Sequence, residues 1–151
     1  MSFNQNEPAP TALLSKTVKE VCKFHESVLA VYLFGSFAKG KEKKGSDIDL
    51  AFLFDHSFYK HDAYQAFAEA QLMGAETGKK LFMVVDVNLL NNASIIFAYE
   101  VVSTGLCIYE RNRDERISFE VLTRSKFYDF YPFIKKSRKK KINSIIKRQE
   151  E

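Results

Sequence analysis

Two short apolar segments, residues 29–34 and 47–54, constrain the fold more than any other feature of the chain. The first reads LAVYLF and stops at Gly35, and the second reads DIDLAFLF. Runs of this length, rich in β-branched and aromatic residues and bounded by turn residues, are typical of buried strands. Alternation along the second segment divides it into two faces. Ile48, Leu50, Phe52 and Phe54 lie on one face, and Asp47, Asp49, Ala51 and Leu53 lie on the other.

The remaining elements are predicted from helical periodicity and from further apolar runs. Helices are expected at about Ala12–Ser27 (with Thr11 as N-cap), His61–Gly74 and Asn92–Thr104, and further strands at Leu81–Val87 and Leu106–Tyr109. From Asp114 onward the pattern is again helical and predicts two helices that are broken near Pro132. This order predicts an α+β fold in which helices cover one small mixed β-sheet.

Length and composition fit one folded domain. The chain has 151 residues, of which 46% are hydrophobic and 28% charged, so wholesale disorder is excluded. We expect a single domain over residues 1–151, with a loose N-terminal segment at 1–10 and a basic, helical extension at 114–151. About 40 residues follow the last predicted strand, which is too few for a separate acceptor-binding domain.

The net charge of +4 is unevenly distributed along the chain. Residues 1–110 carry 10 Lys/Arg and 13 Asp/Glu, whereas residues 111–151 carry 13 Lys/Arg and 6 Asp/Glu. The larger part is therefore acidic, and direct nucleic-acid binding is not expected from it. The basic run 135–141 is a solvated helix face in the simplest interpretation, or else a contact for an acidic partner or an RNA-bearing complex. The aromatic residues before it (Phe127, Tyr128, Phe130, Tyr131 and Phe133) include candidates for a partner-binding patch.

The sequence favours a cytoplasmic protein. Its two cysteines, Cys22 and Cys107, are far apart and form no metal-ligand motif, which fits a reducing compartment. No apolar run approaches the roughly 20 residues of a membrane span, and the N-terminal residues do not resemble a secretory signal. We therefore expect no contact with a membrane.

The candidate active site combines Gly35-Ser36 with Asp47 and Asp49, after a spacing of ten residues. A glycine at the end of a strand permits a tight turn with an open backbone, and the helical turn that begins at Ser36 offers N–H groups to a phosphate. The two aspartates project from the same face of a strand, where they can converge on divalent cations. Carboxylate and phosphate oxygens are the ligands that Mg²⁺ prefers. Asp86, in the apolar run MVVDV, is the candidate third carboxylate.

These residues resemble a known superfamily. The segment YLFGSFAKGKEKKGSDIDLAFLF is similar to the GS-x10-DxD signature of nucleotidyltransferases related to DNA polymerase β. The later segments VVDVNLLNNASIIFAYEVVSTGLCIYERN and RISFEVLTRSKFYDFYPFI resemble the minimal nucleotidyltransferase (MNT) family.

The resemblance implies a role for each residue of the motif. Gly35 and Ser36 would hold the triphosphate of ATP, with Lys39 and Ser46 as further nucleotide-binding candidates. Asp47, Asp49 and Asp86 would bind two Mg²⁺ ions and act in catalysis, with Asp86 activating the acceptor. The loop GSFAKG departs from the arginine-containing loop of many relatives. Lys39 keeps the positive charge but lacks the bidentate fork of arginine.

The resemblance also implies a partner. MNT proteins of this size typically accompany a HEPN-domain ribonuclease toxin, which they neutralise by transferring AMP from ATP to a tyrosine. The leading hypothesis is therefore an antitoxin that acts as a protein adenylyltransferase on a HEPN toxin. The alternatives are a small-molecule nucleotidyltransferase of the aminoglycoside type, in which a homodimer could build the acceptor cleft, nucleotide addition to an RNA end, and a non-catalytic, steric antitoxin.

Overall fold

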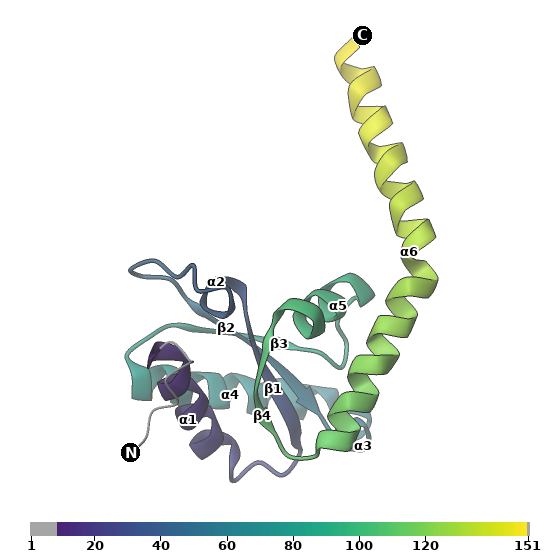
Figure 1. Cartoon of the computed structure of the whole chain (residues 1–151). Helices are drawn as coiled ribbons and strands as arrows, with labels where there is room; N and C mark the ends of the chain where they lie inside the picture. Colours follow the sequence, from purple (N-terminus) through teal and green to yellow (C-terminus); the bar gives the residue numbers. More distant parts are fainter. Residues whose placement is uncertain (1–8, 151) are drawn as a thin grey trace.

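A four-stranded mixed sheet forms the centre of the computed structural model, which describes residues 9–150 (Figure 1). The strands are β1 (Val28–Phe34), β2 (Ile48–Phe54), β3 (Val85–Leu89) and β4 (Leu106–Glu110), in the order β3-β2-β1-β4. β1 pairs antiparallel with β2 and β4, whereas β2 and β3 run parallel. The predicted mixed sheet is confirmed, and β3 and β4 are its edge strands.

Helices cover both faces of this sheet. They are α1 (Ala9–Cys22), α2 (Gly35–Ala38), α3 (His56–His61), α4 (Ala63–Leu81), α5 (Ile95–Thr104) and α6 (Arg113–Glu150). α1 and α4 pack against each other on one face, and α5 packs with the beginning of α6 on the other (Figure 1). None of the helices in residues 9–150 is both long and apolar enough to cross a membrane.

The alternation along β2 separates two apolar cores, as the sequence predicts. Ile48, Leu50, Phe52 and Phe54 belong to the core beneath α1 and α4. Ala51 and Leu53 belong to the core beneath α5, together with Tyr32 and Val101. Asp49 precedes Ala51 by two residues and therefore lies on the α5 face of the sheet.

Helix boundaries differ from the prediction in the N-terminal half. α1 begins at Ala9 and includes Thr11, so Thr11 is not the N-cap, and the helix ends at Cys22. Most of the predicted loose segment 1–10 lies outside the described residues. The helix predicted at 61–74 corresponds to α4, which begins at Ala63 and continues to Leu81, and the short α3 before it was not predicted. Asp55 and Asp62 accept hydrogen bonds from the backbone N–H groups of Phe58 and Gln65, and so cap the starts of α3 and α4.

The predicted strand Leu81–Val87 is wrong at its N-terminal end. α4 continues to Leu81 and is closed by Phe82 in the left-handed conformation (φ 54°), after which the Met83 N–H donates to the Gly78 carbonyl. This left-handed cap with its backbone hydrogen bond ends the helix within an apolar run. β3 then occupies Val85–Leu89.

The predicted break near Pro132 is also wrong, because α6 is a single helix of 38 residues. At about 1.5 Å per residue it is roughly 57 Å long. Proline removes one hydrogen-bond donor and crowds the preceding turn, but here that turn is solvent-exposed, and water can satisfy the freed carbonyl. The second half of α6 leaves the body and projects away from it (Figure 1).

Side-chain hydrogen bonds connect the first half of α6 to the sheet. The buried Tyr32 hydroxyl donates to Glu120 over 2.6 Å, and Arg116 donates to both Glu110 and Glu120. Burial is the largest contribution to a pKa of Tyr32 well above its ordinary value, followed by the hydrogen bond to Glu120. The tyrosine thus remains a neutral donor beneath a charged network. Arg124 extends the attachment by donating to the Val102 carbonyl of α5 over 3.0 Å.

Candidate functional site

The turn after β1 brings the Gly-Ser and Asp-x-Asp parts of the predicted motif into contact. Gly35 has φ +74°, a conformation that side chains rarely adopt. A Cβ placed on Gly35 would lie 2.2 Å from Oδ2 of Asp49, so the carboxylate occupies the space that a side chain would fill. Two features therefore require glycine at this position: the positive φ of the backbone and the close approach of the Asp49 carboxylate.

A row of three residues crosses the sheet at this point. Phe34 at the end of β1 is opposite Asp49 on β2, and Asp49 is opposite Asp86 on β3. Directly paired residues of neighbouring strands point to the same face. The structure thus places Asp49 and Asp86 side by side, although 36 positions separate them in the chain, and an aromatic ring closes the other end of the row.

The three predicted carboxylates act on one another electrostatically. The pKa of Asp49 is raised above its usual range, first by its partial burial and then by the negative charges of Asp86 and Asp47. Asp47 lies one residue before β2, and both Asp47 and Asp86 are exposed. The site is therefore a concentration of negative charge that opens toward solvent, with its most sheltered carboxylate at Asp49.

This set of side chains suits a hard divalent cation by its chemistry. Mg²⁺ takes oxygen ligands, keeps several waters and shares the phosphate oxygens of a substrate, so an open group of carboxylates fits it. A cation would also relieve the repulsion that raises the Asp49 pKa. No three His, Cys, Asp or Glu side chains within residues 9–150 enclose a metal position by themselves.

The predicted nucleotide-binding residues fall into two groups. Ser36 is in α2, a single turn whose N-cap, Phe34, contributes no side-chain hydrogen bond to the helix start. Lys39 caps the other end of α2, and its side chain is exposed. Ser46 instead closes the following loop. Its hydroxyl accepts from the Lys43 N–H over 2.8 Å, and its own N–H donates to the Lys43 carbonyl over 2.9 Å. Ser46 therefore shapes the loop, whereas Ser36 and Lys39 are available to a ligand.

An open cleft of about 440 Å³ lies beside the acidic row, along the free edge of β3. Its lining includes Asp49 and Asp86 together with Phe34, Gln71, Asn88 and Phe97. The rings of Phe34 and Phe97 meet edge to face with centroids 5.3 Å apart. This volume is within the range of small-molecule sites.

Of the lining residues named above, only the two aspartates were predicted from the sequence, and Asn88 and Phe97 illustrate why the others were missed. Asn88 follows Asp86 by two positions and shares its face of β3, a signal that strand periodicity contains. Phe97 comes from α5, and its approach to Phe34 depends on how that helix packs, so no local pattern predicts it.

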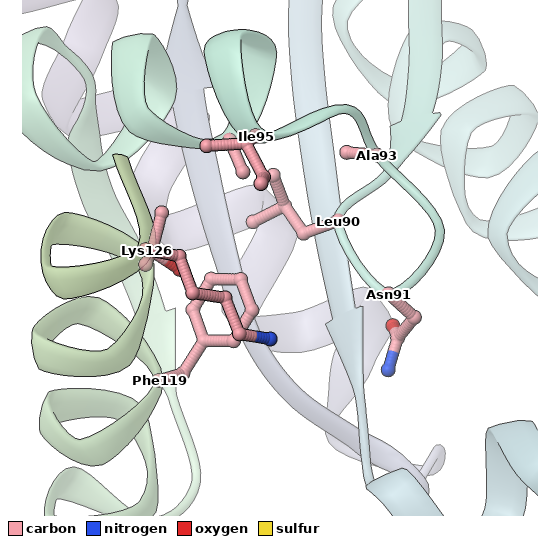
Figure 2. A pocket seen from close by; sticks show the side chains of 8 residues that line it. Leu90, Asn91, Ala93, Ile95, Phe119 and Lys126 are labelled. Carbon is pink, nitrogen blue, oxygen red and sulfur yellow. The ribbon is translucent and has the colours of Figure 1, made fainter. Parts of the chain in front are cut away.

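A second hollow lies at the other end of the sheet, between the start of α5 and the first half of α6 (Figure 2). Leu90, Ile95, Phe119 and Lys126 line it, and its volume is about 110 Å³. Asn91, at its rim, is engaged with the backbone of Phe54 through both its oxygen and its nitrogen. This space is too small for a nucleotide. The cleft beside β3 is the candidate site because Asp49 and Asp86 line it.

The family of the chain is established by its sequence. Residues 16–114 match the family described as polymerase beta nucleotidyltransferase. This chain is a member of that nucleotidyltransferase family. The matched residues include β1, the Gly35 turn and all three aspartates of the site. No curated protein matches the chain.

Solved structures share the fold of this nucleotidyltransferase. A chain of a toxin–antitoxin crystal structure with AMP-PNP superposes with a TM-score of 0.63 at 22% identity, covering 87% of this chain and 98% of that one. A chain of the complex between a tri-AMPylated HEPN toxin of Shewanella oneidensis and its MNT antitoxin gives 0.59 at 20% identity, covering 90% and 98%. A toxin–antitoxin variant, in which two aspartates two positions apart are changed to glutamate, gives 0.63 at 20% identity, covering 87% and 98%. At these identities the likeness establishes the fold.

Proposed function

We propose that this nucleotidyltransferase is an antitoxin that transfers AMP from ATP to a tyrosine of a HEPN ribonuclease toxin. The observation that carries the proposal is the row of Asp49 and Asp86 beside the Gly35 turn, in a chain of the nucleotidyltransferase family. Support for the acceptor comes from a structural neighbour, an MNT antitoxin bound to a tri-AMPylated HEPN toxin. Support for the nucleotide comes from a neighbour with AMP-PNP.

The acidic row supplies the charge arrangement that nucleotidyl transfer needs. Asp47, Asp49 and Asp86 would hold Mg²⁺, which would offset the charge of the triphosphate and favour the departure of pyrophosphate. Asp49, held against Gly35, is the fixed carboxylate of the three. Ser36 and the N–H groups of the turn after Phe34 would contact phosphate oxygens, with Lys39 adding positive charge at the loop.

The transfer itself makes one bond and breaks one. The acceptor hydroxyl oxygen attacks the α-phosphorus of ATP, the α–β phosphoanhydride bond breaks, and pyrophosphate departs. Asp86 accepts the hydroxyl proton, a role that its exposed position at the cleft allows. The products are an O-adenylylated tyrosine and pyrophosphate.

The test is transfer of label from α-labelled ATP to a purified HEPN-domain toxin of the same organism, in the presence of Mg²⁺. We expect one labelled protein band of toxin size and loss of the toxin's ribonuclease activity. The variant Asp47→Asn, Asp49→Asn serves as the blank, and Asp129→Asn, on the exposed surface of α6, as its matched control. Label confined to small molecules or RNA, or equal labelling by the blank, would overturn the proposal. Neutralisation without label would indicate a steric antitoxin.

A further inference from the structure

The last 21 residues of α6 form an arm that is almost entirely exposed to solvent. We use "arm" for residues 130–150, which follow the last aromatic contacts with α5 at Phe127 and Tyr128. Every residue of the arm is exposed except Ile134, which is half-buried. The arm extends from the body as a continuous helix (Figure 1). Among residues 9–150, packing against the body therefore contributes little to the helical form of the arm beyond the contact of Tyr131 with Phe127 at its start.

The charges of the arm do not support a free helix either. It contains eight Lys/Arg and one acidic residue, Glu150. Like charges stand four positions apart at Lys135 and Lys139 and again at Lys136 and Lys140, where they repel each other on a helix surface. The body half of α6 contrasts with this, because Arg116, Glu120 and Arg124 alternate in sign at the same spacing. Negative charge on another molecule would relieve this repulsion.

An apolar stripe accompanies these charges. Ile142, Ile145 and Ile146 follow the i, i+3, i+4 pattern and are each about half exposed, and Phe130 and Phe133 are exposed nearer the body. Aliphatic residues at this spacing are the usual anchors of a helix that binds in a protein groove. A phosphate backbone offers charge but no aliphatic groove, and a second arm would bring the same positive charge. The combination therefore fits a protein surface that is both acidic and apolar.

We infer that the arm is the docking element for the acceptor protein, through an acidic surface of that protein with an apolar groove. The inference rests on the proposed function, because it identifies the partner as the protein that receives AMP. It assigns binding to the arm and chemistry to the acidic row at β3.

The position of the arm relative to the cleft suits this division. The ring of Phe127, just before the arm, stacks on Tyr99 of α5 with centroids 3.7 Å apart. Two residues earlier on α5, Phe97 lines the cleft beside Asp49 and Asp86. α5 thus connects the root of the arm to the wall of the site, and the arm leaves the body on the side where α2 and α5 lie (Figure 1). A protein held by the arm is kept near the cleft.

The experiment measures the Kd between full-length chain and the purified HEPN-domain toxin by calorimetry. The first variant, Ile142→Gln, Ile145→Gln, Ile146→Gln, removes the apolar stripe and keeps helix propensity. The second, Lys139→Gln, Lys140→Gln, Lys141→Gln, removes three charges of the arm. The matched controls alter exposed residues of the body: Leu13→Gln with Leu72→Gln, and Lys16→Gln with Lys23→Gln and Lys60→Gln.

We expect the isoleucine variant to weaken binding about 100-fold and the lysine variant about 10-fold, with a flatter dependence on salt for the latter. The body controls should bind like the unchanged chain, and all variants should share its thermal unfolding midpoint. AMP transfer at saturating toxin should stay within about twofold, because the arm is distant from the reacting atoms.

Each contrary outcome has a distinct meaning. If both arm variants bind the toxin like the unchanged chain and AMP transfer is intact, the docking role of the arm is wrong and the proposed function still holds. Binding through the arm without any transfer overturns the proposed function and leaves the docking role. Absence of toxin binding by the unchanged chain overturns both. Tighter binding of a single-stranded RNA oligonucleotide than of toxin, lost in the lysine variant, overturns the protein partner in favour of nucleic acid.

Discussion

The two halves of α6 show how one helix can be supported in two different ways. The first half lies on the sheet through the network of Tyr32, Arg116 and Glu120, and its ionic pairs alternate in sign. The arm carries almost only positive charge, and within residues 9–150 it is exposed over nearly its whole length. The first half belongs to the structure that builds the candidate site, whereas the arm is the part that we propose binds a partner. Changes in the body should therefore alter chemistry or stability, and changes in the arm should alter association alone.

The largest effect is expected for Asp49→Asn. It removes the most sheltered carboxylate of the acidic row, and transfer should fall by about 10³-fold or more. Toxin binding through the arm should remain within about twofold, which a calorimetric titration measures alongside the transfer assay. Weakened toxin binding by this variant would contradict the assignment of chemistry to the body and of binding to the arm.

The next largest loss of transfer activity is expected for Gly35→Ala. The added methyl group meets Asp49 Oδ2 and must adopt φ +74°, so the turn and the carboxylate have to separate. We expect transfer to fall about 100-fold and the free energy of unfolding by about 2 kcal/mol. Gly40→Ala is the matched control, since Gly40 also has positive φ but nothing within 4 Å of its Cβ position. Equal losses in the two variants would show that backbone conformation, rather than contact with Asp49, is decisive.

Glu120→Gln tests the attachment of the first half of α6. Burial by itself would raise the Glu120 pKa, but hydrogen bonds from Tyr32 and Arg116 outweigh it, and the pKa lies below its usual range. A carboxyl group with a lowered pKa in the folded protein stabilises it above the unfolded value and loses this contribution as pH falls through the folded value. At pH 7 the variant should therefore be less stable by about 2 kcal/mol.

The pH dependence distinguishes this cause from a simple packing defect. Denaturant titrations of both proteins should show the difference shrinking as pH falls below about 4, where the unchanged chain also loses the charge. A gap that persists undiminished in acid would assign the effect to the shape of the side chain. Asp129→Asn, which changes an exposed carboxylate of the same helix, should leave stability unchanged at either pH.

The smallest effect is expected for Pro132→Ala. Alanine restores a backbone donor in the arm and raises local helix propensity. Circular dichroism at 222 nm should show slightly more helix, while the unfolding midpoint of the body should shift by less than about 1 °C, because Pro132 and its neighbours in the arm are exposed to solvent. A clear rise of the midpoint would indicate that the arm is coupled to the body after all.

Much of the site could be predicted because it follows from short-range rules. Strand alternation assigns Asp49 to its face, and a glycine at the end of an apolar strand predicts the turn at Gly35. The pairing of Asp49 with Asp86 follows once β2 and β3 are neighbours. Nucleotide binding by Ser46 stays a prediction, because a serine in a glycine- and lysine-rich loop serves equally well to close a turn.

The predictions from sequence are wrong where solvent exposure or tertiary packing determines an element boundary or a side-chain contact. Propensity favours a break at Pro132, yet an exposed helix tolerates the lost hydrogen bond because water replaces it. The run from Leu81 to Val87 has the composition of a strand, but a left-handed cap at Phe82 assigns its first residue to α4. The contact between Phe97 and Phe34 depends on the docking of α5, which the local sequence does not determine.

The place of β3 at the edge of the sheet affects how much of the time Asp86 lies beside Asp49. Among the strands of residues 9–150, β3 is hydrogen-bonded to β2 only, so the amide groups on its other side have no strand partner there. Edge strands of this kind open more readily than central ones, and Asp86 would move with β3 while Asp49 stays on β2. The third carboxylate thus belongs to the more labile part of the sheet. Hydrogen exchange of the β3 amides would report the fraction of time in which β3 is paired with β2 and Asp86 lies beside Asp49. We expect this exchange to slow when a nucleotide contacts both strands.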